Sequence, residues 1–125
     1  MMQLLVVVTN RIEKVETLFK ELLDIGIRGA TVIDTQGMAR VLHDDLDKIP
    51  LFGSLKMLIN DQYPFNKTIF VVLEDSQVQP AIGAVKKVLE DLSKPNAGIL
   101  FTVPVNYVEG LFLRSPDVDS KSKTF

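Results

Sequence analysis

Residues able to hold an anion occur in two short segments of the chain. Gly37 and Arg40 lie three positions apart, so a guanidinium can bind an anion where glycine lets the backbone come close. Lys94 and Asn96 flank Pro95 in the second segment and offer further donors. The same residue types are common in solvated loops and turns. The pattern therefore indicates a candidate anion site at each segment.

The segment from 43 to 47 carries the residue types of a metal site, His-Asp-Asp-Leu-Asp. One histidine beside acidic residues is more typical of a solvated loop, because metal ligands also need supporting partners. The chain has one histidine and no cysteine, so it has few residues that could form a catalytic pair of a nucleophile and a base. We therefore predict no metal site and no enzymatic activity.

Composition limits the remaining function classes. The chain has 125 residues, of which 46 % are hydrophobic, and this fits one globular domain with a real core. The net charge of −2 argues against a nucleic-acid partner. No apolar run approaches the roughly 20 residues that span a bilayer, and the start of the chain does not resemble a secretory signal. We predict a cytoplasmic protein without direct membrane insertion.

Hydrophobic patterns predict four strands and two helices. The strands are expected at 4–8, 30–33, 68–72 and 99–103. Helical spacing predicts a first helix from Ile12 to Leu23 that ends at Gly26, and a second helix across 82–92. Asn10 with Glu13, and Ser76 with Gln79, are typical of capping boxes at the two helix starts.

This order of elements predicts an α+β, ferredoxin-like βαββαβ sandwich. Such a fold has a four-stranded antiparallel sheet with two helices on one face. A long connection from 36 to 67 separates its two halves, and the apolar stretch around Leu51, Phe52 and Leu55 in that connection is a candidate partner-binding segment. We place the domain at residues 1–105 and a partly disordered C-terminal extension at 106–125.

Three of the predicted strands are apolar in both phases. A sheet with helices on one face should instead alternate between apolar and polar residues. Either the tail or the connection covers the second face, or other subunits do. Self-association is the preferred interpretation, because monomers rarely expose an apolar patch of that size.

Two segments carry a family resemblance. Residues 26–32 read Gly-Ile-Arg-Gly-Ala-Thr-Val, and 36–40 read Gln-Gly-Met-Ala-Arg. Together they resemble the helix end, second strand and loop entry of PII signal-transduction proteins, the nitrogen regulatory PII-like family. The second half is similar in pattern through 98–105, so the resemblance covers about residues 3–105 and identifies a divergent member.

The resemblance implies a non-catalytic homotrimer whose sheets line its centre. PII proteins bind adenine nucleotides, and often 2-oxoglutarate, in clefts between subunits, and their long loop docks onto transporters or enzymes. Carried over to this chain, the resemblance implies a possible adenine nucleotide or other small anionic ligand and no certain cofactor. The ligand-binding residues that it implies are Thr31, Gly37, Met38, Arg40, Lys94, Asn96 and Gly98.

The chain departs from the family pattern at the phosphate-binding positions. Ala39 replaces the second glycine of the loop entry, and only Gly98 matches the second phosphate loop. Ile99 stands where that loop has a lysine, and the C-terminal arginine pair of the family falls on Gly110 and Phe112. We therefore predict weak or no ATP binding.

Other proteins with the same topology provide the alternatives. An amino-acid-sensing ACT-like module and a CutA-like trimer of other function remain open. An acylphosphatase would need a glycine-rich loop after the first strand, which 8–11 lacks. An RNA-recognition motif would need base-stacking aromatics on the central strands, where Phe70 stands alone.

Overall fold

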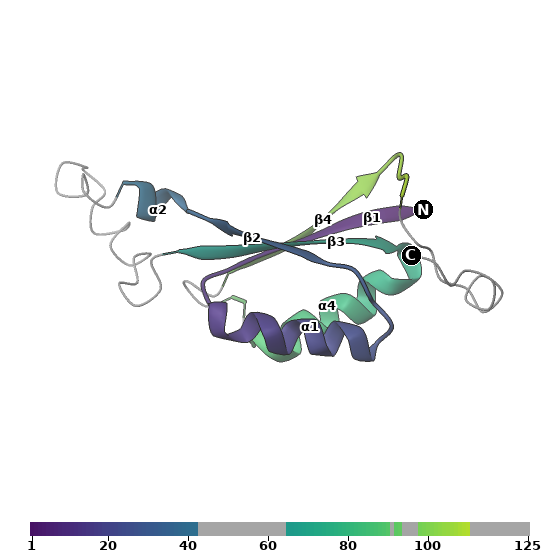
Figure 1. The fold of residues 1–125 in the computed structure, drawn as a ribbon, viewed down its shortest axis with the longest axis horizontal. Coiled ribbons are helices and arrows are strands. Elements are labelled where there is room, and N and C mark those ends of the chain that lie inside the picture. Colours follow the sequence, from purple (N-terminus) through teal and green to yellow (C-terminus); the bar gives the residue numbers. More distant parts are fainter. Residues whose placement is uncertain (43–64, 91, 94–97, 111–125) are drawn as a thin grey trace.

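The computed structural model describes residues 1–42, 65–90, 92–93 and 98–110 (Figure 1). The elements are β1 (Met2–Thr9), the 3₁₀ helix η1 (Ile12–Lys14), α1 (Val15–Asp24), β2 (Thr31–Thr35), α2 (Met38–Val41), β3 (Asn66–Glu74), α4 (Asp75–Leu89) and β4 (Ile99–Val105). All four predicted strands and both predicted long helices are present. The strand β4 ends at the residue where we expect the domain to end; that boundary stays a prediction.

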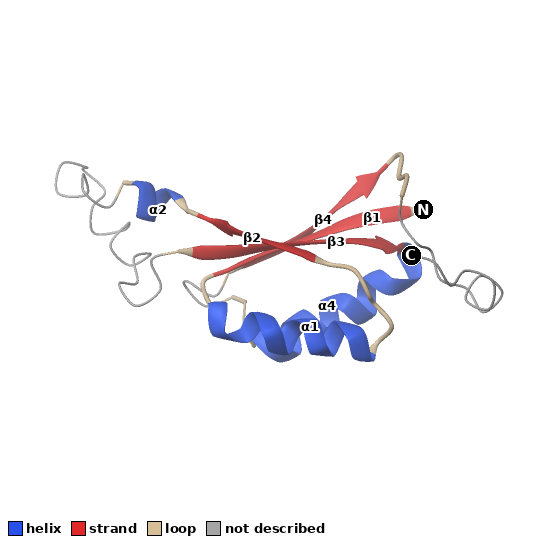
Figure 2. Ribbon diagram, in the orientation of Figure 1, coloured by secondary structure: helices blue, strands red, loops and turns tan. Residues whose placement is uncertain are grey.

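The four strands form one antiparallel sheet in the order β2-β3-β1-β4. Helices α1 and α4 both lie on one face of this sheet, and no described helix covers the opposite face (Figure 2). This arrangement is the ferredoxin-like βαββαβ fold, which confirms the fold prediction.

The strand register decides which side chains meet the helices. Leu5 of β1 lies opposite Val71 of β3, and Val7 lies opposite Ile69. All four are at most 1 % exposed, because helices α1 and α4 cover this phase of the sheet. From the helices the core receives Leu18, Leu22, Ala81, Ala84, Val85, Val88 and Leu89. Burial of this apolar surface is the main favourable term in the stability of the domain.

The end of α1 follows the prediction at Gly26. The N–H of Gly26 donates to the carbonyl of Leu23 at 2.9 Å, and the N–H of Ile27 donates to Leu22 at 2.9 Å. This pair of bonds is a Schellman motif, which requires a left-handed residue between them. Gly26 has φ +90°, a value that glycine adopts at little cost.

The predicted capping box at the start of α1 is wrong. The chain passes through η1 before α1 begins at Val15, and neither start has a side-chain cap. Instead, the buried Thr9 hydroxyl accepts the N–H of Arg11 at 2.9 Å. The side-chain oxygen of Asn10 is buried without a hydrogen-bond partner. The short-range bond from Thr9 therefore takes the place of the expected cap.

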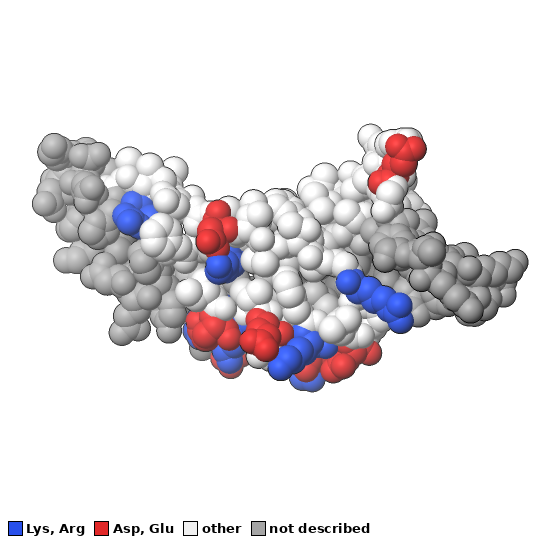
Figure 3. All heavy atoms as spheres, viewed as in Figure 1, with Lys and Arg blue, Asp and Glu red and all other residues white. Residues whose placement is uncertain are grey.

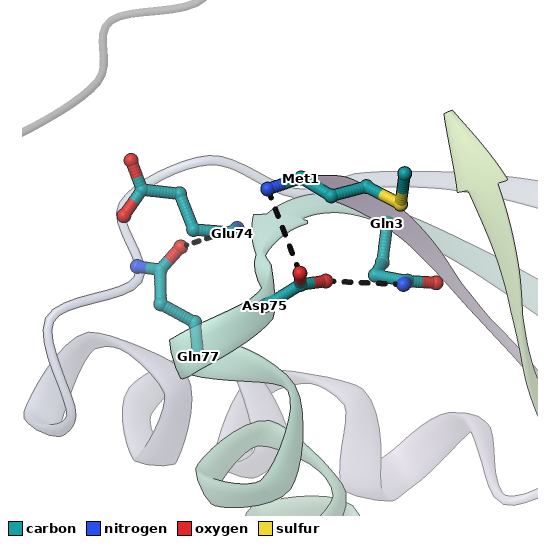
Figure 4. A network of polar contacts seen from close by, with 5 residues as sticks. All are labelled: Met1, Gln3, Glu74, Asp75 and Gln77. Carbon is teal, nitrogen blue, oxygen red and sulfur yellow. Dashed lines mark hydrogen bonds and ion pairs between the residues drawn. The ribbon is translucent and has the colours of Figure 1, made fainter. Parts of the chain in front are cut away.

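The predicted cap of the second helix is also wrong, because α4 begins one residue before Ser76. Glu74 is the N-cap, and the Gln77 side chain accepts the Glu74 N–H at 2.9 Å (Figure 4). Asp75 accepts a hydrogen bond from Gln3 at 3.1 Å and lies 3.5 Å from the amino group of Met1. These contacts fix the first strand against the start of α4.

Candidate ligand site

The ends of β2 and β3 approach each other where the 36–67 connection begins and ends. We call residues 34–40 and 65–68 the neck. Thr35 and Thr68 share a hydrogen bond of 2.8 Å between their hydroxyls, and the Lys67 ammonium pairs with the Asp34 carboxylate. A Cβ on Gly37 would lie 3.2 Å from the side-chain nitrogen of Asn66, so the two segments touch here. The neck is held together by side-chain contacts beyond the β ladder.

Arg40 lies in the short helix α2 within the neck. The N–H of Val41 donates to the carbonyl of Gly37 at 3.1 Å, which closes this turn. The Arg40 guanidinium carbon sits over the Phe65 ring, 5.0 Å from its centroid, and this distance is within the range of a cation–π contact. The Arg40 Nε is buried and has no hydrogen-bond partner among the residues that the structure describes.

The structure brings three of the predicted ligand residues together at the neck: Gly37, Met38 and Arg40. Met38 is 70 % exposed there. Thr31 lies at the other end of β2, paired with Phe70, about 13 Å of strand from Thr35. Lys94 and Asn96 lie outside the described residues. So do the predicted partner-binding residues Leu51, Phe52 and Leu55, and the acidic segment 43–47.

Gly98 lies just before β4, at the same end of the sheet as the neck but at the opposite edge. Its φ is +118°, and a Cβ there would come 2.4 Å from the carbonyl oxygen of Val8. Two strands, β3 and β1, separate β2 from β4. Three strand spacings of roughly 4.8 Å put the two edges about 14 Å apart. Within one chain, Gly98 and Arg40 do not share a compact pocket.

Comparison with known proteins places this geometry in a family. The family model described as nitrogen regulatory protein P-II matches residues 2–111. The chain belongs to the nitrogen regulatory protein P-II family. It is accordingly a PII-like regulatory protein, and the predicted resemblance is confirmed. A search of curated protein sequences found no match.

Solved PII structures share the fold at low sequence identity. Arabidopsis thaliana PII bound to citrate has a TM-score of 0.57 and 20 % identity, and the match covers 83 % of this chain and 74 % of that chain. B. subtilis GlnK has a TM-score of 0.57 and 18 % identity, with 84 % and 85 % coverage. Both confirm the PII fold.

The uncovered face of the PII sheet is apolar. We define the open face as the side chains that alternate with the helix-covered ones on each strand. Its apolar members include Leu4, Val6 and Val8 of β1, Phe70 and Val72 of β3, Ile33 of β2, and Ile99, Phe101 and Val103 of β4, and Thr31, Thr35 and Thr68 share this phase. In Figure 3 the charged side chains gather over the helix layer, and the hollowed side formed by the sheet is largely uncharged.

Sequence reasoning about this PII chain missed Phe65, Asn66 and Thr68 as residues of the neck. Phe65 lies three residues before the predicted third strand and directly before β3, and nothing local in the sequence pairs it with Arg40. The chain also shows no group of three or more His, Cys, Asp or Glu side chains placed to hold a metal ion in its described part. None of the described helices is long and apolar enough to cross a membrane.

Proposed function

We propose that this PII-like protein is a cytoplasmic homotrimer that binds a small anionic metabolite or nucleotide between subunits. It signals rather than catalyses, and it acts on a protein target through the 36–67 connection. The observation that carries this proposal is the apolar open face of the sheet.

The open face supports self-association because it has the composition of a protein interior. Val6 is only 6 % exposed although no helix covers it, since Phe70 and Phe101 flank it in the register. Phe101 itself is 43 % exposed, and Ile33, Ile99 and Val103 are similarly open. A contiguous apolar surface of this kind is typical of an interface. Three sheets that bury their open faces against one another would remove this apolar surface from water.

The placement of the candidate ligand residues supports a cleft between subunits. Arg40 and Gly98 lie at opposite edges of one sheet, about 14 Å apart. A small ligand can meet both only if the β2 edge of one subunit comes next to the β4 edge of another. Trimer formation and ligand binding are therefore linked in this proposal.

The class of ligand follows from the charges at these positions. Arg40 at the neck suits a carboxylate or phosphate group. At the β4 edge, Ile99 presents an apolar side chain that is 54 % exposed and offers no charge to a polyphosphate. The citrate complex of the Arabidopsis relative is an example of a small anion bound by a PII protein. We favour an adenine nucleotide of low charge or a small carboxylate over ATP.

The target is proposed to be a transporter or an enzyme, and the residues proposed to contact it are Leu51, Phe52 and Leu55. The apolar composition of this segment is the reason to assign it to a partner. A nucleic-acid target is not expected for a chain of net charge −2.

Native mass spectrometry followed by calorimetry tests the proposal. We expect a homotrimer, and we expect citrate or AMP to bind more tightly than ATP with magnesium. A monomer at micromolar concentration would contradict the assembly. Sub-micromolar, magnesium-dependent ATP binding would contradict the proposed ligand class while leaving the assembly intact.

A further inference from the structure

We propose that Phe65 is a positioning residue that orients Arg40 to bind one carboxylate or phosphate group of a ligand. This inference rests on the proposed function, which makes Arg40 a ligand residue. It assigns a specific task to a residue that is outside the family motif and outside the core.

The contact joins the two sides of the neck. Arg40 follows β2 and lies in α2, whereas Phe65 is the residue directly before β3. The guanidinium carbon lies 5.0 Å from the ring centroid, within the distance at which the ring face attracts a cation. A planar guanidinium held against a ring has a defined orientation, which a free surface arginine lacks.

Phe65 lies outside the hydrophobic core of the described residues. Its side chain is 43 % exposed, and it is not part of the hydrophobic core formed by the helices and the sheet. A large aromatic side chain in such a position contributes mainly through what it contacts at the surface. In the described part of the neck, that contact is Arg40.

The charge of Arg40 is not matched by an acidic side chain among residues 1–42 and 65–90. Lys67, the other cation of the neck, is already paired with Asp34. The Arg40 Nε is buried without an acceptor, so at this nitrogen no hydrogen bond sets the plane of the group. Among the described residues, the contact with the Phe65 ring is the interaction that orients the guanidinium plane. One oriented guanidinium suits one carboxylate or phosphate, because the planar fork donates two parallel hydrogen bonds to either.

An NMR titration of the full-length protein with succinate and with inorganic phosphate tests this role. The Arg40 Nε–H signal reports directly on the guanidinium. We expect Phe65→Leu to move this signal in the free protein, because the ring current is lost, and to weaken anion binding by about three- to tenfold. Phe65→Tyr keeps the aromatic face, so its affinity should stay within about twofold of wild type. Arg40→Lys keeps the charge without the fork and should bind more weakly than Phe65→Leu.

Tyr107→Leu is the matched control. Tyr107 is an exposed aromatic just past the end of β4, and that end of the sheet is opposite the neck. Its removal should leave anion affinity and the Arg40 signal unchanged. Wild-type affinity in Phe65→Leu, or equal loss in Phe65→Leu and Phe65→Tyr, would overturn the positioning role while the proposed ligand site stands. Failure of the wild-type protein to bind either anion would overturn the ligand site and this inference together.

Discussion

Phe101 lies directly opposite Val6 in the β1–β4 ladder, and both side chains belong to the open face that no helix covers. The neighbouring phase of the same sheet contains Val71, which is 1 % exposed beneath the helices. Val71 and Phe101 are both hydrophobic strand residues, but their environments differ. Val71 packs in the domain core, whereas Phe101 lies partly exposed on the open face.

Aspartate substitutions at Val71 and at Phe101 distinguish the role of the core from the role of the open face. Val71→Asp places an unpaired charge in the core, which costs several kcal/mol and should unfold the domain. Phe101→Asp should keep the circular dichroism of the wild type but dissociate the proposed trimer, since its charge reaches water in the monomer. Light scattering on the folded variant measures the change. Persistence of the wild-type mass in Phe101→Asp would show that the open face is not the subunit interface.

Two glycine-to-alanine changes should have opposite effects on stability. At Gly98 the φ of +118° and the 2.4 Å approach of a Cβ to the Val8 carbonyl both oppose a side chain. We expect Gly98→Ala to lower the free energy of unfolding by more than about 1 kcal/mol. Gly83 lies inside α4 with open space around its Cβ position, so Gly83→Ala should raise it by about 0.5–1 kcal/mol. Urea denaturation measures both; destabilisation by Gly83→Ala would contradict the packing described for α4.

Glu90 is the C-cap residue that follows α4, and it has a positive φ of 65°. A residue with a Cβ is strained in this conformation, whereas glycine adopts it easily. We expect Glu90→Gly to raise the free energy of unfolding by about 1 kcal/mol. Lys20→Gly, at an exposed position in the middle of α1, is the control and should lower it by about 1 kcal/mol. A loss of stability in both variants would show that Glu90 makes a contact worth more than the strain.

Phe52→Ser tests the proposed partner segment, which lies outside the described residues. If Phe52 contacts a target, the variant should capture less of it in a pull-down and keep the wild-type melting temperature. If Phe52 instead belongs to a packed core, the change should cost on the order of 3 kcal/mol. Unchanged capture together with a large fall in melting temperature would reject the role in partner binding.

Much of the fold was predictable because its determinants are local. The β-branched runs predicted the four strands to within two residues at every end, and the 3.6-residue period predicted the two long helices. Gly26 ended its helix as expected, since a left-handed residue is needed there whatever surrounds it. The two capping boxes were also predicted from local sequence signals, but those predictions were wrong. Several polar residues near each helix start compete. Glu74 rather than Ser76 is the N-cap of α4, and the first helix has no side-chain cap, while the Thr9 hydroxyl accepts the Arg11 N–H.

The candidate site was predictable only in part. The residue types at Gly37 and Arg40 marked a candidate anion-binding segment, and the structure places both residues at the neck. Phe65 could not be found in this way, because its contact with Arg40 joins residues that are distant in the sequence. That contact exists only once the β2–β3 ladder has brought both ends of the connection together.

By itself, the sequence determined the elements, their order and the presence of more apolar strand surface than two helices can cover. It did not determine which phase of each strand faces the helices, since residues 4–8 and 69–72 are apolar in both. Only the tertiary structure decided this, through the register that places Leu5 opposite Val71 and Val6 opposite Phe101. The physical reason is that side chains alternate along a strand, so one choice of register and helix position assigns every residue to the core or to the open face.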